Sequence, residues 1–377
     1  MVYLHLLKQT NTGTVWDVVS RRVGASKNKF KYLFFALGAC IHAAKFMRKV
    51  LIIDATTIKA KFRGCLLTAI FQDGNFQIMP LGFAVVDSEN EQAWTWFFKK
   101  LMSIVPDADD LAACAYTVGE FRQKFDEIER RSPLCANYLR GIGISHWSRV
   151  YFQGKRYNIM SSNIAESLNA AMAKALEFPI VSMVETIRMM LMRWFYCRRS
   201  KANKHLGPVT PEVEELLLKH LSDSAGLSVS PASADIYQVS NSHGILFTVD
   251  LDRKTCTCKV FETLGIPCSH ALAAARVNGI PIPRLVEENY KSDLWRNTYS
   301  VVVMLVPDVA DHDIPEDMLN PNGVPPETNA GPGRPRKRRI PSNGEERAIK
   351  RRKIGPSRCR RCYGTGHNRA TCRNPIP

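Results

Sequence analysis

Six of the eleven cysteines lie near histidines, in two groups whose spacing suits a metal ion. The first group is Cys256, Cys258, Cys268 and His270. In an extended chain residues i and i+2 point to the same side, so Cys256 and Cys258 can grip one ion. Three thiolates and an imidazole make a closed tetrahedral set, which is typical of structural zinc. The alternative is that these are ordinary core cysteines.

The second group follows close to the C-terminus and consists of Cys359, Cys362, His367 and Cys372. Gly364 and Gly366 permit the sharp turns that wrap so short a loop around an ion. So small a segment has no hydrophobic core, so we expect zinc to supply nearly all of its folding free energy. The sequence therefore predicts two structural Zn²⁺ sites.

The basic charge of the chain is concentrated behind its globular part. The formal net charge is +17, and residues 331–377 hold 15 Lys and Arg against two Glu, leaving the other residues nearly neutral. Such a tail suits a polyanion, most often nucleic acid, or serves only as a nuclear address. No run of 18 uncharged apolar residues occurs, which excludes a membrane-spanning protein. We expect a nuclear protein.

The elements that must position these residues follow from periodicity and turn residues. Residues 29–48 predict a buried helix, so residues 1–49 form an N-terminal helical segment. Strands are expected at 50–58, 64–72 and 76–86, with a hairpin turn at Asp73, Gly74 and Asn75. Helices are expected from residue 91 to about 104, from 117, and from Asn163 with a break near Pro179. Residues 206–235 are a partly helical linker.

Ahead of the first metal group the pattern predicts a hairpin, with strands at 237–240 and 245–251, and behind it an Ala-rich helix at 270–276. This hairpin, the Cys-x-Cys pair and the Cys-x-His pair before a helix resemble the SWIM zinc finger. We therefore expect a SWIM-type module over residues 236–300. From about residue 306 Pro, Gly and charge dominate, and a disordered basic tail is expected over 301–355.

The second metal group resembles a CCHC zinc knuckle over residues 356–377. Knuckles of that family bind single-stranded nucleic acid by stacking an aromatic ring on a base. Tyr363 is the candidate ring, and a knuckle that only contacts protein is the alternative. Upstream, a Gly-Arg-Pro core resembles an AT-hook and equally a bipartite nuclear address, which we favour. The candidate nucleic-acid contacts there are Arg334, Arg336, Lys337, Arg338 and Arg339.

Residues 50–101, together with HWSRVYF at 146–152 and RYNIMSSNIAESLNA at 156–170, resemble the transposase of plant Mutator-like elements. The resemblance implies an α/β, ribonuclease-H-like core with a helical insertion, here over residues 50–205. Such enzymes cut DNA with three carboxylates that hold two Mg²⁺ ions. By the resemblance, Asp54 matches the first acid and Glu166 the third. Read without it, Asp54 is a polar strand end and Glu166 a capping partner of Asn163.

The second acid of that family has no counterpart on a strand. The helix that begins at residue 91 is followed by Pro106 and then Asp107, Asp109 and Asp110, which lead directly into the insertion. The core is therefore expected to be incomplete, with the strand of Asp54 unpaired on one side. Mg²⁺ is expected only if the chain is catalytically active.

Three functions remain open at this point. The first is a zinc-binding, nucleic-acid-binding protein derived from a Mutator-like transposase that has lost catalysis. The second is an active transposase that recruits one of the aspartates at 107–110. The third is a protein-interaction module whose fingers are docking surfaces. The partners expected are DNA or single-stranded nucleic acid, and proteins through the fingers.

Overall fold

The structure is a computed structural model of the whole chain, and it describes residues 1–23, 27–61, 63–105, 125–126, 128–130, 133–142, 163–307 and 323–324. Two compact units are present, residues 1–329 and 330–377. Of the tail predicted to be disordered over 301–355, the structure describes residues 301–307, where Val303 is buried, and 323–324, which form a short strand, so the expected disorder is wrong at these positions. The second unit lies outside the described residues, and with it the predicted knuckle and the predicted nucleic-acid contacts of the tail. That set comprises Arg334, Arg336, Lys337, Arg338, Arg339, Cys359, Cys362, Tyr363, His367 and Cys372.

The N-terminal segment contains a hairpin between two helices, so the predicted helical segment 1–49 is wrong in its centre. Its elements are α1 (Val2–Thr10), β1 (Val15–Val23), β2 (Lys27–Ala36) and α2 (Gly38–Ala44). Residues 32–35 of β2 are buried on both faces of the sheet. A strand covered on both sides loses its apolar–polar alternation and becomes a continuous apolar run, which periodicity cannot distinguish from a buried helix.

Gly38 marks the point where β2 ends and α2 begins. A Cβ at this position would stand 2.0 Å from the carbonyl oxygen of Thr12. Only glycine allows the backbones to approach so closely. The hydroxyl of Thr14 also accepts a hydrogen bond from the Gly38 amide, at 3.1 Å. The loop before β1 therefore fixes where the helix α2 starts.

The central sheet confirms the three strands expected after residue 50. They are β3 (Ile52–Thr57), β4 (Cys65–Gln72) and β5 (Ile78–Val86), followed by α3 (Glu91–Met102). The strand order is β1-β2-β5-β4-β3, all neighbours being antiparallel, with β10 (Gly323–Val324) added in parallel to β2. Among the described strands, β3 pairs only with β4 and lies at the sheet edge, as expected.

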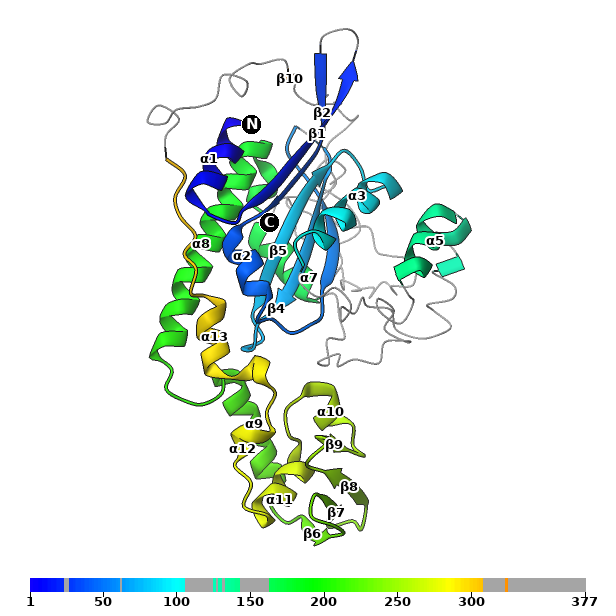
Figure 1. The fold of residues 1–377 in the computed structure, drawn as a ribbon, viewed down its shortest axis with the longest axis vertical. Coiled ribbons are helices and arrows are strands. Elements are labelled where there is room, and N and C mark those ends of the chain that lie inside the picture. The colour runs from blue at the N-terminus through cyan, green and yellow to red at the C-terminus, as the bar shows by residue number, and fades with distance from the viewer. Residues whose placement is uncertain are drawn as a thin grey trace, which may run out of the picture. The chain divides into compact units, whose positions relative to one another are not determined.

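Helices cover both faces of this sheet. On one face Phe34 of β2 meets Phe97 of α3, with ring centroids 6.2 Å apart. On the other face Phe35 stacks on Phe83 at 5.0 Å. Figure 1 shows α3 to the right of the sheet, and α2 and the long helix α8 (Ile180–Lys204) to its left. The result is an α/β layered core, as the sequence predicted in outline.

The helical region before α8 follows the expected pattern where it is described. It contains α5 (Pro133–Ile142), α7 (Asn163–Met172) and the short 3₁₀ turn η2 (Ala175–Glu177). Pro179 stands immediately before α8, which confirms the predicted break. The helix expected from residue 117 lies mostly outside the described residues. In the described part of the chain no helix has the length and apolarity needed to cross a bilayer.

The C-terminal part of the first unit is a small four-stranded sheet with short helices. Its sheet order is β6-β7-β8-β9, and the predicted hairpin and Ala-rich helix are confirmed. The elements are α9 (Pro211–Asp223), β6 (Ser228–Pro231), β7 (Ile236–Ser240), β8 (Leu246–Asp250), β9 (Thr255–Cys256), α10 (Val260–Leu264), α11 (Ser269–Val277), α12 (Ile282–Leu285), η3 (Glu288–Tyr290) and α13 (Ser292–Thr298).

The predicted linker 206–235 is therefore corrected. Helix α9 buries Val213 and packs against α11, and β6 pairs with β7. Hence the module begins well before residue 236. Three prolines, at 208, 211 and 231, and a serine-rich stretch suggested a loose connection, whereas Pro211 occupies the first turn of α9, where proline is tolerated.

The chain returns from this module to the hairpin turn between β4 and β5. The fully buried carboxylate of Asp73 accepts hydrogen bonds from the indole of Trp295 at 3.1 Å and the hydroxyl of Tyr299 at 2.6 Å. Its other oxygen accepts from the amides of Asn75 and Gln77. A Cβ on Gly74 would lie 2.0 Å from the carbonyl oxygen of Asn289. This contact ties the module to the central sheet.

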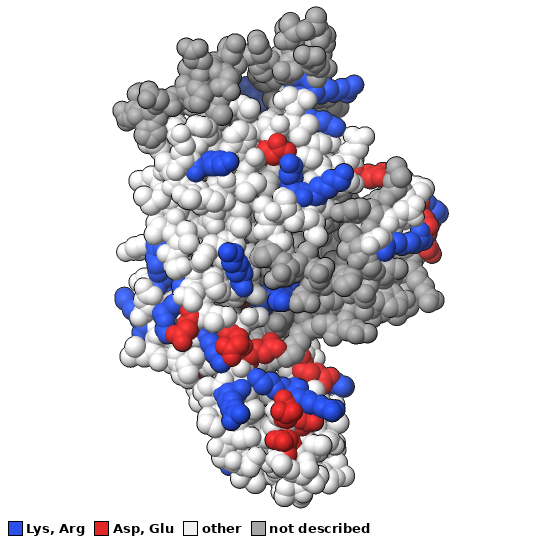
Figure 2. Space-filling model, in the orientation of Figure 1, with Lys and Arg blue, Asp and Glu red and all other residues white. Residues whose placement is uncertain are grey.

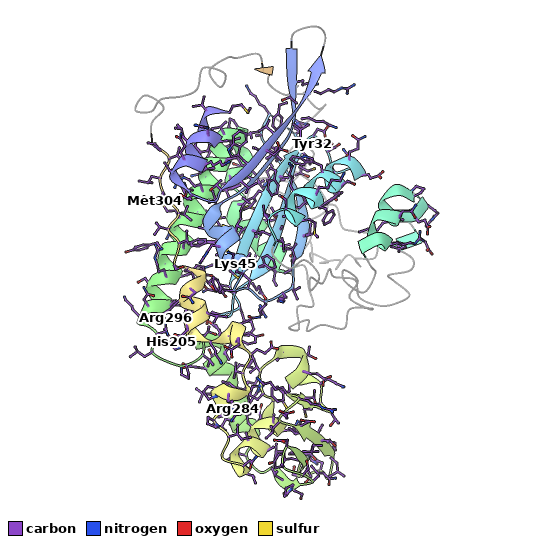
Figure 3. All side chains as sticks on the ribbon, in the orientation of Figure 1. Tyr32, Lys45, His205, Arg284, Arg296 and Met304 are labelled. Atoms are coloured by element: carbon purple, nitrogen blue, oxygen red, sulfur yellow. The ribbon has the colours of Figure 1, made fainter. Side chains whose placement is uncertain are left out.

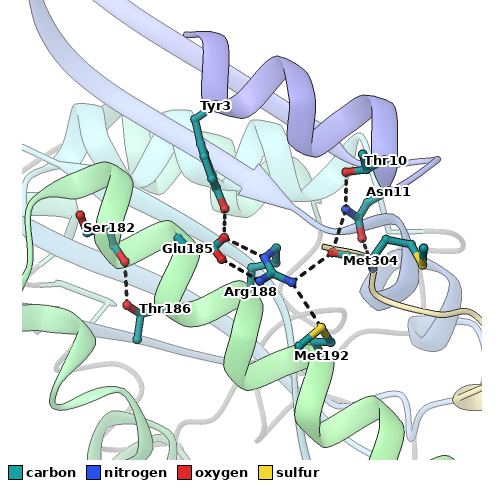
Figure 4. Close-up of polar contacts among 9 residues, drawn as sticks. All are labelled: Tyr3, Thr10, Asn11, Ser182, Glu185, Thr186, Arg188, Met192 and Met304. Carbon is teal, nitrogen blue, oxygen red and sulfur yellow. Dashed lines mark hydrogen bonds and ion pairs between the residues drawn. The ribbon is translucent and has the colours of Figure 1, made fainter. Parts of the chain in front are cut away.

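Two further contacts attach the same C-terminal segment to α8. Arg296 of α13 donates to the carbonyl of His205, just beyond α8, at 3.1 Å, and Figure 3 shows the two residues side by side. At the other end of α8, buried Arg188 holds Glu185 in a two-point ion pair and donates to the carbonyl of Met304 at 3.0 Å (Figure 4). The hydroxyl of Tyr3 donates a hydrogen bond to the same Glu185, and burial together with this hydrogen bond raises the pKa of Tyr3.

Candidate metal centre and acidic site

The four side chains of the first cysteine–histidine group converge on one point. Their ligand atoms all lie within 4.8 Å of one another. His270 Nδ1 lies 3.8 Å from Cys256 Sγ and 3.9 Å from Cys268 Sγ. A tetrahedral zinc ion, with bonds of about 2.3 Å to sulfur and about 2.0 Å to nitrogen, separates such atoms by about 3.6 Å. The group therefore fits one zinc ion with little adjustment.

Local backbone geometry presents each ligand. Cys256 ends β9, and the amide of Lys259 donates to its carbonyl at 2.8 Å. Lys259 itself is left-handed, with φ of 65°, so the chain turns back sharply after Cys258. Cys268 stands at the N-terminal cap of α11, which places His270 in the first turn of that helix. A turn and a helix start thus supply two ligands each.

The ring of His270 is held in place by an aromatic neighbour. Phe247 of β8 stacks on it, with centroids 3.8 Å apart and planes inclined by 22°. This contact holds the ring in the orientation in which Nδ1 faces the sulfurs. Phe247 is a positioning residue that the motif itself did not reveal. Its place on the strand facing the metal group is the signal that could have indicated it.

The thiols are close enough to oppose one another's ionisation. Hydrogen bonding with the other two sulfurs lowers the pKa of Cys258. The corresponding contact with Cys258 raises the pKa of Cys256 to about 11, and the pKa of Cys268 is raised further by both neighbours and by burial. Without a metal ion, the three sulfurs can share one negative charge. A bound dication stabilises all three as thiolates.

Asp54 lies on β3, where sequence comparison placed it. Asp54 pairs with Thr68 of β4, Thr68 pairs with Phe83 of β5, and Phe83 pairs with Phe35 of β2. Residues that are paired across a sheet point to the same face, so Asp54 lies on the face of Phe35, which is opposite to α3. Its nearest polar partner is Asn169 of α7, whose side-chain Nδ2 donates to Asp54 Oδ2 at 2.7 Å. Asn169 was not among the predicted site residues.

Glu166 lies on α7, the same helix as Asn169, but the contact with Asp54 is made by Asn169. It is exposed in the first turn of α7, three residues before Asn169. That spacing puts both on one side of the helix and is the signal that could have indicated Asn169. Asp107, Asp109 and Asp110 lie outside the described residues.

The described acidic site does not fit a magnesium pair. Mg²⁺ is bound through oxygen, yet the Asn169 group turned toward Asp54 is an N–H donor. Within the described part of the chain, the cysteine–histidine group is the only cluster of three or more potential ligands.

Comparison with known families matches two segments of the chain. Residues 247–279 match the SWIM zinc finger, and they include all four converging ligands. Residues 50–126 match the MULE transposase domain, and they include Asp54 but end before Glu166. No curated protein and no solved structure matches the chain.

Proposed function

We propose that this chain, which carries a MULE transposase domain and a SWIM zinc finger, is a transposase-derived protein that binds zinc and nucleic acid but does not cut DNA. The amide of Asn169 on the carboxylate of Asp54 carries the second half of this proposal. A ribonuclease-H-like origin is supported by the antiparallel β3-β4-β5 meander followed by α3.

Cleavage by such a core requires two ions about 3.5–4 Å apart, held by carboxylates. One carboxylate oxygen of Asp54 accepts a hydrogen bond from the amide of Asn169, and Glu166 is exposed in the first turn of α7. The family places its fourth strand beside the first, and β3 has no such described neighbour. Misplacing a catalytic group by about 1 Å can lower the rate about a hundredfold, so a site that lacks one of its carboxylates is expected to be catalytically inactive.

Zinc has a structural role in this proposal. The ion would join β9, the turn after it and the start of α11, and so hold together a module that buries few large side chains. Nucleic acid is the proposed partner because the chain is strongly basic and because the MULE domain derives from a DNA-processing enzyme. A nuclear location follows from the same basic tail as part of the proposal.

A nicking assay tests the loss of catalysis. Purified full-length chain is incubated with supercoiled DNA that carries Mutator-type terminal repeats, in Mg²⁺ or Mn²⁺. We expect no nicking above background. Nicking that disappears in both Asp54→Ala and Glu166→Ala variants would falsify the proposal and favour an active transposase.

Nucleic-acid binding is tested separately, by filter binding of single-stranded and duplex DNA across a salt series. We expect affinity to fall steeply with salt, each neutralised phosphate contributing about −0.7 to the log–log slope for single strands. A chain that retains neither strand type at low salt would instead support a protein-docking function.

A further inference from the structure

Helix α8 presents a stripe of side chains to solvent that the fold does not use. Its members recur at intervals of three and four residues, which places them on one side of the helix. Tyr196 is 68% exposed and Met189 45% exposed. We call this the α8 stripe, and it comprises Met189, Arg193, Tyr196, Cys197, Lys201 and Lys204, all exposed.

The stripe is basic, and no acid of the same segment offsets it. Residues 186–211 contain six Lys and Arg and no Asp or Glu. Three of the six have internal roles: Arg188 pairs with Glu185, Arg198 donates to the carbonyl of Ile78, and Arg199 donates to that of Tyr299.

The other three are Arg193, Lys201 and Lys204, all on the stripe. Their side chains make no hydrogen bond or ion pair with any described residue. Figure 2 shows Lys and Arg atoms gathered along the left edge of the molecule, where Figure 1 places α8. These three positive charges are thus available to an external partner.

Tyr196 distinguishes this stripe from an ordinary solvated face. Its ring stands between Arg193, three residues earlier, and Lys204, two turns later, and most of it is in water. A large exposed ring among cations is what binds unpaired bases, because every base offers a face for stacking while its phosphate meets a neighbouring cation. In a duplex the bases are stacked on one another, so the ring would have no face to bind.

We infer that the α8 stripe is a contact surface for single-stranded nucleic acid. Phosphates lie against Arg193, Lys201 and Lys204, and one base stacks on Tyr196. From residue 193 to residue 204 the helix rises about 16 Å, enough for several nucleotides. This inference rests on the proposed nucleic-acid binding and assigns part of it to the folded body, in addition to the basic tail.

Photo-crosslinking of the full-length chain to a radiolabelled oligothymidylate locates the contact directly. Trypsin would release Tyr196 in the peptide of residues 194–198, clear of every peptide of the tail. We expect labelled adducts on this peptide as well as on peptides from residues 331–377. Adducts confined to the tail peptides would overturn the inference while leaving nucleic-acid binding intact, and the absence of any binding would overturn both.

Substitutions measure the contribution of each part in the full-length chain. Arg193→Glu with Lys204→Glu should lower the salt slope by about 1.4, the value for two phosphate contacts. Tyr196→Ala should weaken binding about 5- to 150-fold, whereas Tyr196→Phe, which keeps the ring, should bind like the original chain.

The matched control is Lys219→Glu with Arg253→Glu, an equal charge change at exposed positions of α9 and of the turn after β8. Equal losses in the control and the stripe variant would overturn the inference, since the effect would then be one of net charge alone. Displacement of the oligonucleotide by polyglutamate, with no loss in Tyr196→Ala, would assign the stripe to an acidic protein instead.

Discussion

At the scale of single residues, the amide of Asn169 determines what the carboxylate of Asp54 can bind. An N–H group at 2.7 Å stabilises the carboxylate and occupies the direction from which a cation would approach. Changing this one side chain is therefore the most direct way to probe the site.

Asn169→Asp should create a cation site at Asp54. Two carboxylates at hydrogen-bond distance repel one another unless a proton or a metal ion lies between them. We expect the variant to bind Mn²⁺ at least tenfold more tightly than the unmodified chain, measured by the loss of free Mn²⁺ in electron paramagnetic resonance. Asn169→Ala, which removes the amide without adding a ligand, is the control. Equal Mn²⁺ binding by all three chains would show that Asn169 does not govern the site.

Cys258→Ser should remove one zinc ion per chain. The remaining two thiolates and one imidazole leave an incomplete site, in a module that buries few large side chains and that the ion would help to hold together. We expect native mass spectrometry to show one fewer zinc ion and limited proteolysis to cut within residues 236–276. The control is Cys197→Ser, an exposed cysteine on α8. Full zinc content in Cys258→Ser would mean that the ion is held elsewhere.

Zinc affinity at this site should fall as pH falls. Binding requires the thiolate forms of three cysteines, and the pKa of Cys256 in the metal-free cluster is raised to about 11. Zinc binding near neutral pH therefore releases protons, and excess protons oppose it. Titration with a competing chelator between pH 6 and pH 8 checks this. An affinity that is constant over that window would exclude thiol ionisation as a coupled step.

At the scale of elements, the sequence predicted those whose signals are local. Asp73, Gly74 and Asn75 indicated the hairpin turn, and the metal ligands indicated the finger with its strands and helix. Strand β2 was mistaken for a helix because both of its faces are buried under elements packed on the sheet, such as α3, which lies far away in sequence. Asn169 was missed because its contact with Asp54 spans 115 positions.

At the scale of the whole molecule, Asp73 connects the MULE core to the SWIM module. Its buried carboxylate receives four hydrogen bonds, two from its own turn and two from α13 and the residue after it. Burial and the adjacent Asp73 charge raise the pKa of Tyr299, which keeps that hydroxyl protonated and able to donate. The two parts should therefore unfold together and not as independent domains.

Asp73→Ala tests this coupling. The substitution leaves the indole of Trp295 and the hydroxyl of Tyr299 buried without their acceptor, and it removes the side chain that shapes the turn. A buried donor left without its acceptor costs about 1–3 kcal/mol, so two such donors cost about 2–6 kcal/mol. We expect the free energy of unfolding in urea to fall by that amount and the single transition to separate into two. Asp252→Ala, at an exposed turn position of the finger, should change neither. If Asp73→Ala unfolds at the same urea concentration as the unmodified chain, the hydrogen bonds of Asp73 contribute nothing to joining the two parts.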